Sequence, residues 1–171
     1  MGVLICGKSG IGKSELALGL INQKHCLIAD DAVLFKKDPE NDTLMGYCPP
    51  VLQDFLEVRG IGILNIRVLF GESTIRHTAK LTLIVKILQI TEQKLQTIDR
   101  LCGIHETQEI LGIPIASVTI PLMPGRNLAV LVESAVRNHA LKLQGYHAGT
   151  DFTQRHNTYM QKEHLLSLQE S

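Results

Sequence analysis

The chain lacks an excess of charge of either sign. Its 171 residues include 17 lysines and arginines and 17 aspartates and glutamates, which gives a formal net charge of zero. No global electrostatic field therefore draws the protein onto nucleic acid or onto an anionic membrane. We expect neither among its partners, and any charged ligand must be met by a local site.

Long hydrophobic runs are also missing. The apolar run Leu81–Leu88 follows Lys80 and is interrupted by Lys86. It falls short of the ~20 residues that a membrane-spanning helix needs. Met1 leads directly into a short apolar run and a glycine-rich loop, which is not the pattern of a signal peptide.

Closely spaced cysteines are absent as well. The four cysteines are scattered and contain no Cys-x-x-Cys pair: Cys6, Cys26, Cys48 and Cys102. This spacing argues against a zinc site and against a disulfide framework, and the seven histidines show no metal-ligand spacing. A reducing, cytosolic setting is the simplest interpretation.

What the sequence does contain is enough apolar material for one core. With 44% hydrophobic residues, we expect a single domain over residues 1–171. The beginning predicts a strand at Gly2–Cys6, a helix at Lys13–Asn22 and a strand at His25–Ala29. This order is typical of a βαβ unit with a parallel strand pair.

The rest of the chain predicts more strands than helices. The expected strands are Ala32–Phe35, Thr43–Tyr47, Phe55–Arg59, Lys80–Gln89 and Ile115–Ile120. The expected helices are Leu128 to about Leu143, stopped by Gly145, and Asp151 to near Leu168, with Asp151 and Gln154 forming a cap. Residues 92–112 are expected to form a loop and a short helix. Taken together, the expected elements predict an α/β fold with a mixed sheet.

One motif carries a chemical prediction by itself. It is the phosphate-binding loop pattern of glycine, four residues, glycine, lysine and serine: Gly7-Lys8-Ser9-Gly10-Ile11-Gly12-Lys13-Ser14. It lies between a predicted strand and a predicted helix, which is the context that the pattern requires. A glycine-rich turn without function would not explain the agreement of residue types, spacing and flanking elements.

The motif predicts how ATP or ADP is held. The glycines let backbone N–H groups approach the phosphates, and the start of the helix adds its positive end. Lys13 neutralises the outer phosphates, and Ser14 offers its hydroxyl to Mg²⁺.

Two further acids follow the loop helix. Asp30 and Asp31 end the next apolar segment. Phosphoryl transfer next to the loop needs a metal ligand or a catalytic base at such a position. Adjacent aspartates also occur as simple turn or cap residues. The loop upstream favours the catalytic interpretation.

Three more charged residues are weaker candidates. Glu57 and Arg59 are two apart and share one face of a strand, which is also the pattern of a surface ion pair. Arg126 precedes a helix start, where it and the helix dipole could hold an anion. The same pattern is common in loops with a capping Asn.

Four separated segments together resemble HPr kinase/phosphorylase in type and order. They are Gly7 to Glu15, Leu27 to Asp31, Leu56-Glu-Val-Arg-Gly-Ile-Gly-Ile63 and Pro124-Gly-Arg-Asn127. The resemblance covers roughly Gly2 to Gly145 and concerns the catalytic domain of that family. It implies a P-loop nucleotide-binding fold similar to that of phosphoenolpyruvate carboxykinase.

The resemblance also implies an activity. Members of the family phosphorylate a serine of the phosphocarrier HPr with ATP or pyrophosphate, and reverse this with inorganic phosphate. Carried onto this sequence, Ser14 and Asp30 bind Mg²⁺ with help from Glu57, and Asp31 acts as base and, in reverse, as acid. Arg59 and Arg126 then lie near the phosphates or the docked phosphocarrier.

The same resemblance implies the assembly. The C-terminal segment 145–171 becomes a partner-binding helix, and the protein a homo-hexamer. Two other interpretations remain open on the residues alone. One is a P-loop kinase or NTPase that acts on a small molecule or on water, and the other is a regulatory module that senses nucleotide without turning it over.

Overall fold

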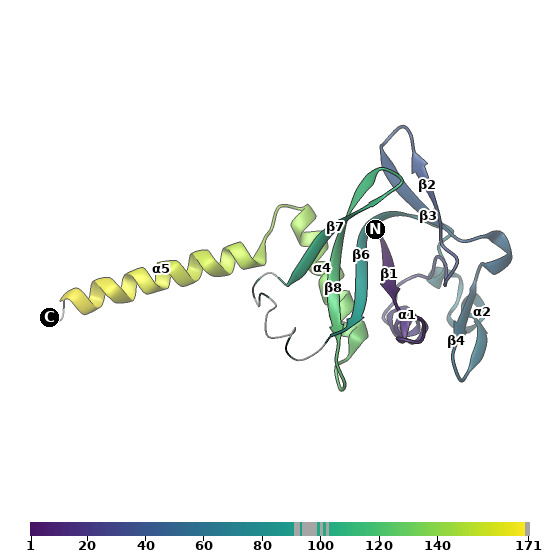
Figure 1. The fold of residues 1–171 in the computed structure, drawn as a ribbon, viewed down its shortest axis with the longest axis horizontal. Helices are drawn as coiled ribbons and strands as arrows, with labels where there is room; N and C mark the ends of the chain where they lie inside the picture. The colour runs from purple at the N-terminus through teal and green to yellow at the C-terminus, as the bar shows by residue number, and fades with distance from the viewer. Residues whose placement is uncertain (91–92, 94–98, 100, 102, 170–171) are drawn as a thin grey trace.

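A six-stranded mixed sheet forms the centre of the molecule (Figure 1). The structure, a computed structural model, describes residues 1–90, 93, 99, 101 and 103–169. The sheet strands are β1 (Gly2–Gly7), β2 (Leu34–Asp38), β3 (Thr43–Tyr47), β6 (Thr78–Gln89), β7 (Ile104–Ile110) and β8 (Ile113–Leu122). The class predicted from the sequence, α/β with a mixed sheet, is confirmed.

Strand β6 organises this sheet. It pairs with β8 in parallel along one edge, and along the other with β3, antiparallel, and then with β1, parallel. Gly7 at the end of β1 lies opposite Ile87, and Ile87 lies opposite Ile120. The loops that follow β1 and β8 therefore leave the sheet at the same edge, where α/β proteins place their ligands.

Two helices cover one face of the sheet, namely α1 (Lys13–Asn22) and α4 (Leu128–Leu143). Leu16 and Val132 from these helices pack on Leu83, Val85 and Ile87. Each such fully buried side chain stabilises the fold by about 1.5–3 kcal/mol. Because Ile84 is also buried, in a cluster on the opposite face, β6 is apolar on both faces.

A smaller layer lies beside α1. It consists of the hairpin β4 (Phe55–Val58) and β5 (Gly62–Asn65), the short helix α2 (Ile66–Phe70) and the 3-10 turns η1 (Pro50–Leu52) and η2 (Glu72–Thr74). Its apolar cluster joins residues of α1, the segment after α1 and the hairpin layer: Ile21, Leu27, Leu56, Val58, Ile66 and Ile75. This cluster fixes the segment that ends at Asp30.

One predicted strand is wrong. Residues 25–29 form a single bridge, Leu27 with Ile75, in place of a strand beside β1. The parallel neighbour of β1 is β6, so the expected compact βαβ unit is not formed. The apolar side chain of Leu27 is buried under the hairpin layer, and periodicity alone cannot distinguish that burial from a sheet.

The segment predicted as loop and short helix contains a strand. Residues 104–110 form β7, an edge strand antiparallel to β8. Five of its seven residues are exposed, so it lacks the apolar alternation that would have predicted it. Residues 91–92, 94–98, 100 and 102 of the same prediction lie outside the described residues.

The other predicted elements are confirmed. The loop strand, the first helix, the hairpin β2–β3, the strands β4, β6 and β8, and α4 agree with the predicted segments to within a few residues. Gly145 follows α4 with φ +89, as its position after the helix predicted.

The last helix, α5 (Ala148–Gln169), projects away from the body (Figure 1). It begins before the predicted start at Asp151, so the predicted cap is wrong. The Asp151 carboxylate accepts hydrogen bonds from Arg155 and Tyr146 instead. Among the described helices, none is both long and apolar enough to cross a membrane.

Candidate functional site

The loop between β1 and α1 bends as the glycine pattern predicted. Gly10 and Gly12 have φ of +75 and +97, a region that side chains disfavour. A Cβ at Gly7 would lie 2.9 Å from Ile11 Cγ2 and 3.0 Å from the carbonyl oxygen of Ile87. The loop therefore needs glycine for its path and also for its packing against β6.

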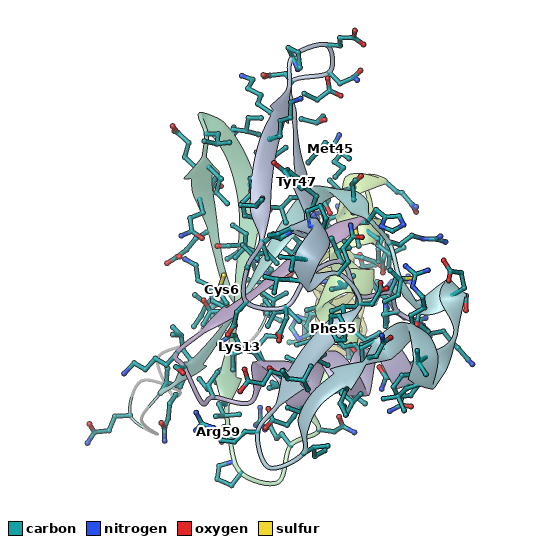
Figure 2. The ribbon with its side chains drawn as sticks, turned by 90° about the vertical axis from the view of Figure 1, so that its right-hand side faces the viewer. Cys6, Lys13, Met45, Tyr47, Phe55 and Arg59 are labelled. Carbon is teal, nitrogen blue, oxygen red and sulfur yellow. The ribbon has the colours of Figure 1, made fainter. Side chains whose placement is uncertain are left out.

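The loop delivers the positive end of α1 to the sheet edge. Gly12 is the N-cap residue and has no side chain to satisfy the free N–H groups of the first turn. Lys13 Nζ donates to the carbonyl oxygen of Gly7 over 3.4 Å, so the ammonium group lies across the loop (Figure 2). The unpaired amides, the helix dipole and the ammonium group together favour the binding of an anion at the β1–α1 loop.

Asp30 lies next to this loop. Its Oδ2 accepts a hydrogen bond of 2.9 Å from the backbone N–H of Glu57 in β4. Burial raises the pKa of Asp30, and the charges of Asp31 and Glu57 raise it too, while the Glu57 hydrogen bond and Lys13 act in the opposite direction. The structure thus brings Lys13, Asp31 and Glu57 into electrostatic range of Asp30.

The donor set around Asp30 fits magnesium better than zinc. Hydroxyl and carboxylate oxygens are the ligands that Mg²⁺ takes, and it usually keeps waters and phosphate oxygens besides one or two protein ligands. Within the described ranges, no group of three or more His, Cys, Asp or Glu side chains is placed to hold a metal ion by itself. The carboxylates of Asp30 and Glu57 lie within electrostatic range of each other, so Mg²⁺ bound here would take its other oxygens from water or phosphate.

Arg59 faces the loop. It lies in the turn just after β4, which ends at Val58. A Cβ built on Gly10 would be 3.1 Å from Arg59 Nη1, so the guanidinium lies against the loop glycine (Figure 2). For the residues described, no ion pair joins Arg59 to Glu57, so the structure does not form the surface pair that the spacing also allowed.

Arg126 lies at the same edge of the sheet but further from these contacts. It is exposed in the connection between β8 and α4, and its backbone N–H donates to Met123 over 3.4 Å. The neighbouring Asn127 caps α4 by accepting from the Val130 N–H over 3.2 Å, which is the alternative that the sequence left open for this loop. In the described part of the chain, no recorded contact joins Arg126 to the loop.

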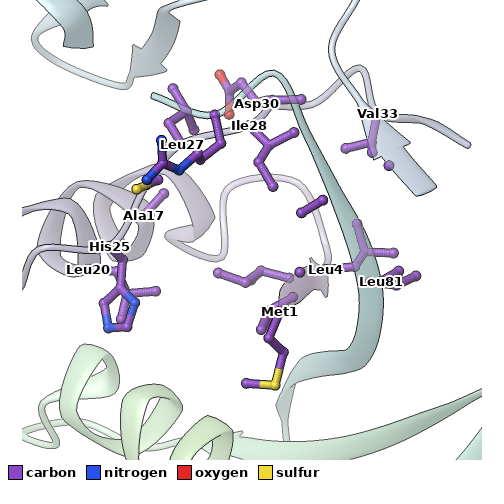
Figure 3. A pocket seen from close by; sticks show the side chains of 18 of the residues that line it. Met1, Leu4, Ala17, Leu20, His25, Leu27, Ile28, Asp30, Val33 and Leu81 are labelled. Atoms are coloured by element: carbon purple, nitrogen blue, oxygen red, sulfur yellow. The ribbon is translucent and has the colours of Figure 1, made fainter. Parts of the chain in front are cut away.

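A cavity of about 1010 Å³ opens beside the loop (Figure 3). Gly7, Lys13, Asp30 and Asp31 line it at the phosphate-loop end. Apolar side chains such as Leu4, Leu20 and Leu27 line much of the rest. The volume is of the order of a small-molecule site, about 300–1,000 Å³.

One polar cluster next to the site was missed from the sequence. Arg67 of α2 donates from Nε and Nη2 to the two carboxylate oxygens of Asp54, over 2.7 and 3.0 Å. It also forms an ion pair with Glu72. These residues are far enough apart in the chain that no spacing rule links them, although the non-glycine φ of +72 at Asp54 marks a constrained turn.

Comparison with known proteins decides the family. Residues 1–156 match the family model described as the HPr serine kinase C-terminal domain. The chain belongs to this family.

Individual relatives agree with this assignment. The chain is 50% identical to the HPr kinase/phosphorylase of Chromobacterium violaceum over 95% of its length, and 53% identical to that of Neisseria meningitidis, also over 95%. Because it covers 51% and 50% of those two proteins, it spans about half the length of the curated relatives.

A solved structure matches the fold. It is described as the Hpr(Ser) kinase/phosphatase from Coxiella burnetii, with a TM-score of 0.79 and 38% sequence identity. The match covers 89% of this chain and 90% of that one. The family assignment thus holds for the chain fold as well as for the sequence.

Proposed function

We propose that this chain is a protein-serine kinase and phosphorylase that acts on an HPr-type phosphocarrier. It would transfer a phosphoryl group from ATP or pyrophosphate to a serine and reverse the transfer with inorganic phosphate. The names of the relatives support this substrate. The observation that carries the proposal is the placement of Lys13, Asp30 and Asp31 around one glycine loop at the edge of the sheet.

The proposal includes the finer fold class. We assign residues 1–171 to a single P-loop domain similar to the phosphoenolpyruvate carboxykinase-like P-loop fold. The glycine loop between β1 and α1 and the mixed order of the sheet support it. Amides of residues 7–14 would hold the phosphates of the donor.

The metal site in this proposal is made of oxygens. Ser14 and Asp30 would bind Mg²⁺, with Glu57 assisting, and the ion would neutralise phosphate charge. The Glu57 N–H holds Asp30 Oδ2, which leaves Oδ1 for a ligand. Lys13 would carry the remaining positive charge on the outer phosphates.

Asp31 moves the proton in this proposal. It is exposed at the cavity, unlike the half-buried Asp30, so a serine hydroxyl can reach it. Its carboxylate would accept the hydroxyl proton as the serine oxygen bonds to the transferred phosphorus and the bond from that phosphorus to the leaving ADP or phosphate breaks. In reverse, an oxygen of inorganic phosphate would bond to the phosphorus of phosphoserine, and Asp31 would return the proton to the serine oxygen as its bond to phosphorus breaks. Arg59 would stabilise charge at the loop, and Arg126 would act near the phosphates or the docked partner.

The remaining parts of the proposal concern the assembly. Segment 145–171, which contains α5, would hold the phosphocarrier in a homo-hexamer located in the cytoplasm. The described side chains of α5 are almost all exposed, including Phe152, Tyr159 and Met160. A helix with apolar residues at helical spacing is suited to a partner surface.

The test is phosphoryl transfer itself. Incubation of the chain with Mg²⁺, ATP and an HPr-type protein should add one phosphoryl group to a serine, measured by intact mass. Addition of inorganic phosphate should remove it and release pyrophosphate. Asp31→Asn should lose at least about 10²-fold in rate, the lower range for a positioned general base.

The control is Asp42→Asn, which removes a carboxylate that pairs with Lys37 in the β2–β3 turn, away from the loop. It should keep the wild-type rate. Hydrolysis of ATP without modification of the phosphocarrier would favour a small-molecule kinase or NTPase. Nucleotide binding without any turnover would favour a sensing module.

A further inference from the structure

Arg67 contacts two segments that each support Asp30. One contains Asp54 and strand β4, and the other contains Glu72 and the turn η2. The Arg67 side chain is 29% exposed, and that of its partner Asp54 is 19% exposed. The two parallel hydrogen bonds lower the pKa of Asp54, so this pair is ionised at neutral pH. Paired Arg–carboxylate contacts of this kind fix direction as well as distance.

The first connection runs through the hairpin. Asp54 is bound to α2 twice, by its carboxylate to Arg67 and by its carbonyl oxygen to the Ile66 N–H over 2.8 Å. Strand β4 begins at the next residue, and its Glu57 N–H donates to Asp30. Buried Leu56 and Val58 hold β4 in this register.

The second connection runs through η2. Arg67 pairs with Glu72, the first residue of that turn. At the end of the turn, the Thr74 carbonyl accepts from the Leu27 N–H over 2.7 Å, and the Leu27 carbonyl accepts from Arg76 over 2.9 Å. Leu27 is three residues before Asp30.

We propose that Arg67 is a positioning residue that holds Asp30 in the orientation needed for Mg²⁺, acting through Asp54 and β4 on one side and Glu72 and η2 on the other. Asp30 is half-buried and depends on the Glu57 N–H for its direction. Loss of Arg67 removes the side-chain link from α2 to Asp54 and the one from α2 to Glu72. The backbone bond from Ile66 to Asp54 and the apolar packing are then left to hold the start of β4. The carboxylate of Asp30 then rotates, while the glycine loop and Lys13 stay in place.

This inference rests on the proposed role of Asp30 as a metal ligand, and the experiment separates the two. Binding of ADP to the 171-residue chain is measured by calorimetry in EDTA and across a Mg²⁺ titration. The variants are Arg67→Met and Arg67→Lys. Thermal unfolding of each variant shows that it is folded.

In the Arg67 variants, the Mg²⁺ concentration that gives half of the metal-dependent gain in ADP affinity should rise by up to about 10-fold, the lower end of the effect of losing a direct outer partner of a metal ligand, because Arg67 acts on Asp30 indirectly. Affinity in EDTA should stay unchanged because the loop is intact. Arg67→Lys should recover little, since a lysine cannot form two parallel bonds to Asp54.

Arg137→Met is the matched control, because Arg137 also donates twice to one carboxylate, that of Glu133 on α4. Its Mg²⁺ requirement should equal that of the wild type. If Arg67→Met fails to fold, Arg67→Lys and Glu72→Ala, which removes a 77% exposed carboxylate, carry the test.

An unchanged Mg²⁺ requirement in the folded Arg67 variants would overturn the inference. An equal loss of affinity with and without metal would do so as well, because it would show a general structural role. A wild-type chain whose ADP binding ignores Mg²⁺ would instead remove the proposed metal role of Asp30, and with it this inference.

Discussion

At the scale of single residues, Gly12 adopts a backbone conformation that only glycine adopts easily. Its φ of +97 directs the start of α1 toward the loop, and a Cβ there would meet only the Glu15 carboxylate, at 3.8 Å. Gly12→Ala should lower the free energy of unfolding by about 1–2 kcal/mol. It should also weaken ADP binding, because relief of the strain turns the loop N–H groups away. Denaturant unfolding and calorimetry measure the two effects.

Gly145→Ala provides the control for strain. Gly145 has φ +89 and no atom within 4 Å of an added Cβ, so it should show a similar loss of stability. It lies after α4, away from the loop, and ADP affinity should not change. Equal ADP affinity in Gly12→Ala and wild type would contradict the role of this glycine in phosphate binding.

The candidate site divides into residues that the sequence could predict and residues that it could not. The loop residues, Asp30 and Asp31 follow from local pattern, since loop chemistry depends on consecutive positions. Arg59 was a weak candidate, because its contact with Gly10 depends on how the hairpin packs. Arg67 was missed because its role comes from tertiary contacts with Asp54 and Glu72.

At the scale of elements, His139 lies where α4 packs on β6, and its surroundings disfavour the protonated imidazole. Burial lowers the pKa of His139, a backbone hydrogen bond with Thr82 raises it, and the charge of Lys142 lowers it. Its Nε2 is buried and, among the described residues, has no hydrogen-bond partner. The folded protein therefore holds this imidazole in its neutral form.

The free energy of unfolding depends on pH through His139. As the pH falls below about 6.5, the unfolded chain protonates this histidine before the folded chain does, so the free energy of unfolding decreases until the pH reaches the lower pKa of the folded state. His139→Met should lose this part of the pH dependence between pH 7.5 and pH 5, measured by urea unfolding. His147→Met removes an exposed imidazole and should keep the wild-type slope; identical slopes in all three proteins would refute the prediction.

The elements also show where apolar periodicity predicts secondary structure correctly and where it does not. β6 and α4 were predicted because buried faces impose a regular apolar pattern on long segments. β7 was missed because an edge strand with exposed side chains needs no such pattern. The segment 25–29 was mistaken for a strand because its buried residues pack against the hairpin layer instead of joining the sheet.

At the scale of the whole molecule, α5 is separate from the core. Nearly all of its described side chains are exposed, and the three apolar clusters do not include it. Deletion of residues 148–171 should therefore leave the thermal unfolding midpoint and ADP affinity unchanged. Phosphorylation of the HPr-type protein should fall, because the proposed partner-binding helix is gone.

Differential scanning calorimetry and the intact-mass assay together decide this prediction. Retained transfer after the deletion would assign partner binding to the body and leave α5 without that role. A large drop in the unfolding midpoint would show that α5 stabilises the core.

The projecting helix has a further consequence for how the molecule moves in water. Its 22 residues extend for about 33 Å at the usual rise of 1.5 Å per residue. A single chain that is not assembled into the proposed hexamer reorients slowly about the axes perpendicular to this arm and faster about the arm itself. Spin relaxation of the amide nitrogens should then depend on the angle between each N–H bond and α5, and the sheet and the arm should report different tumbling times.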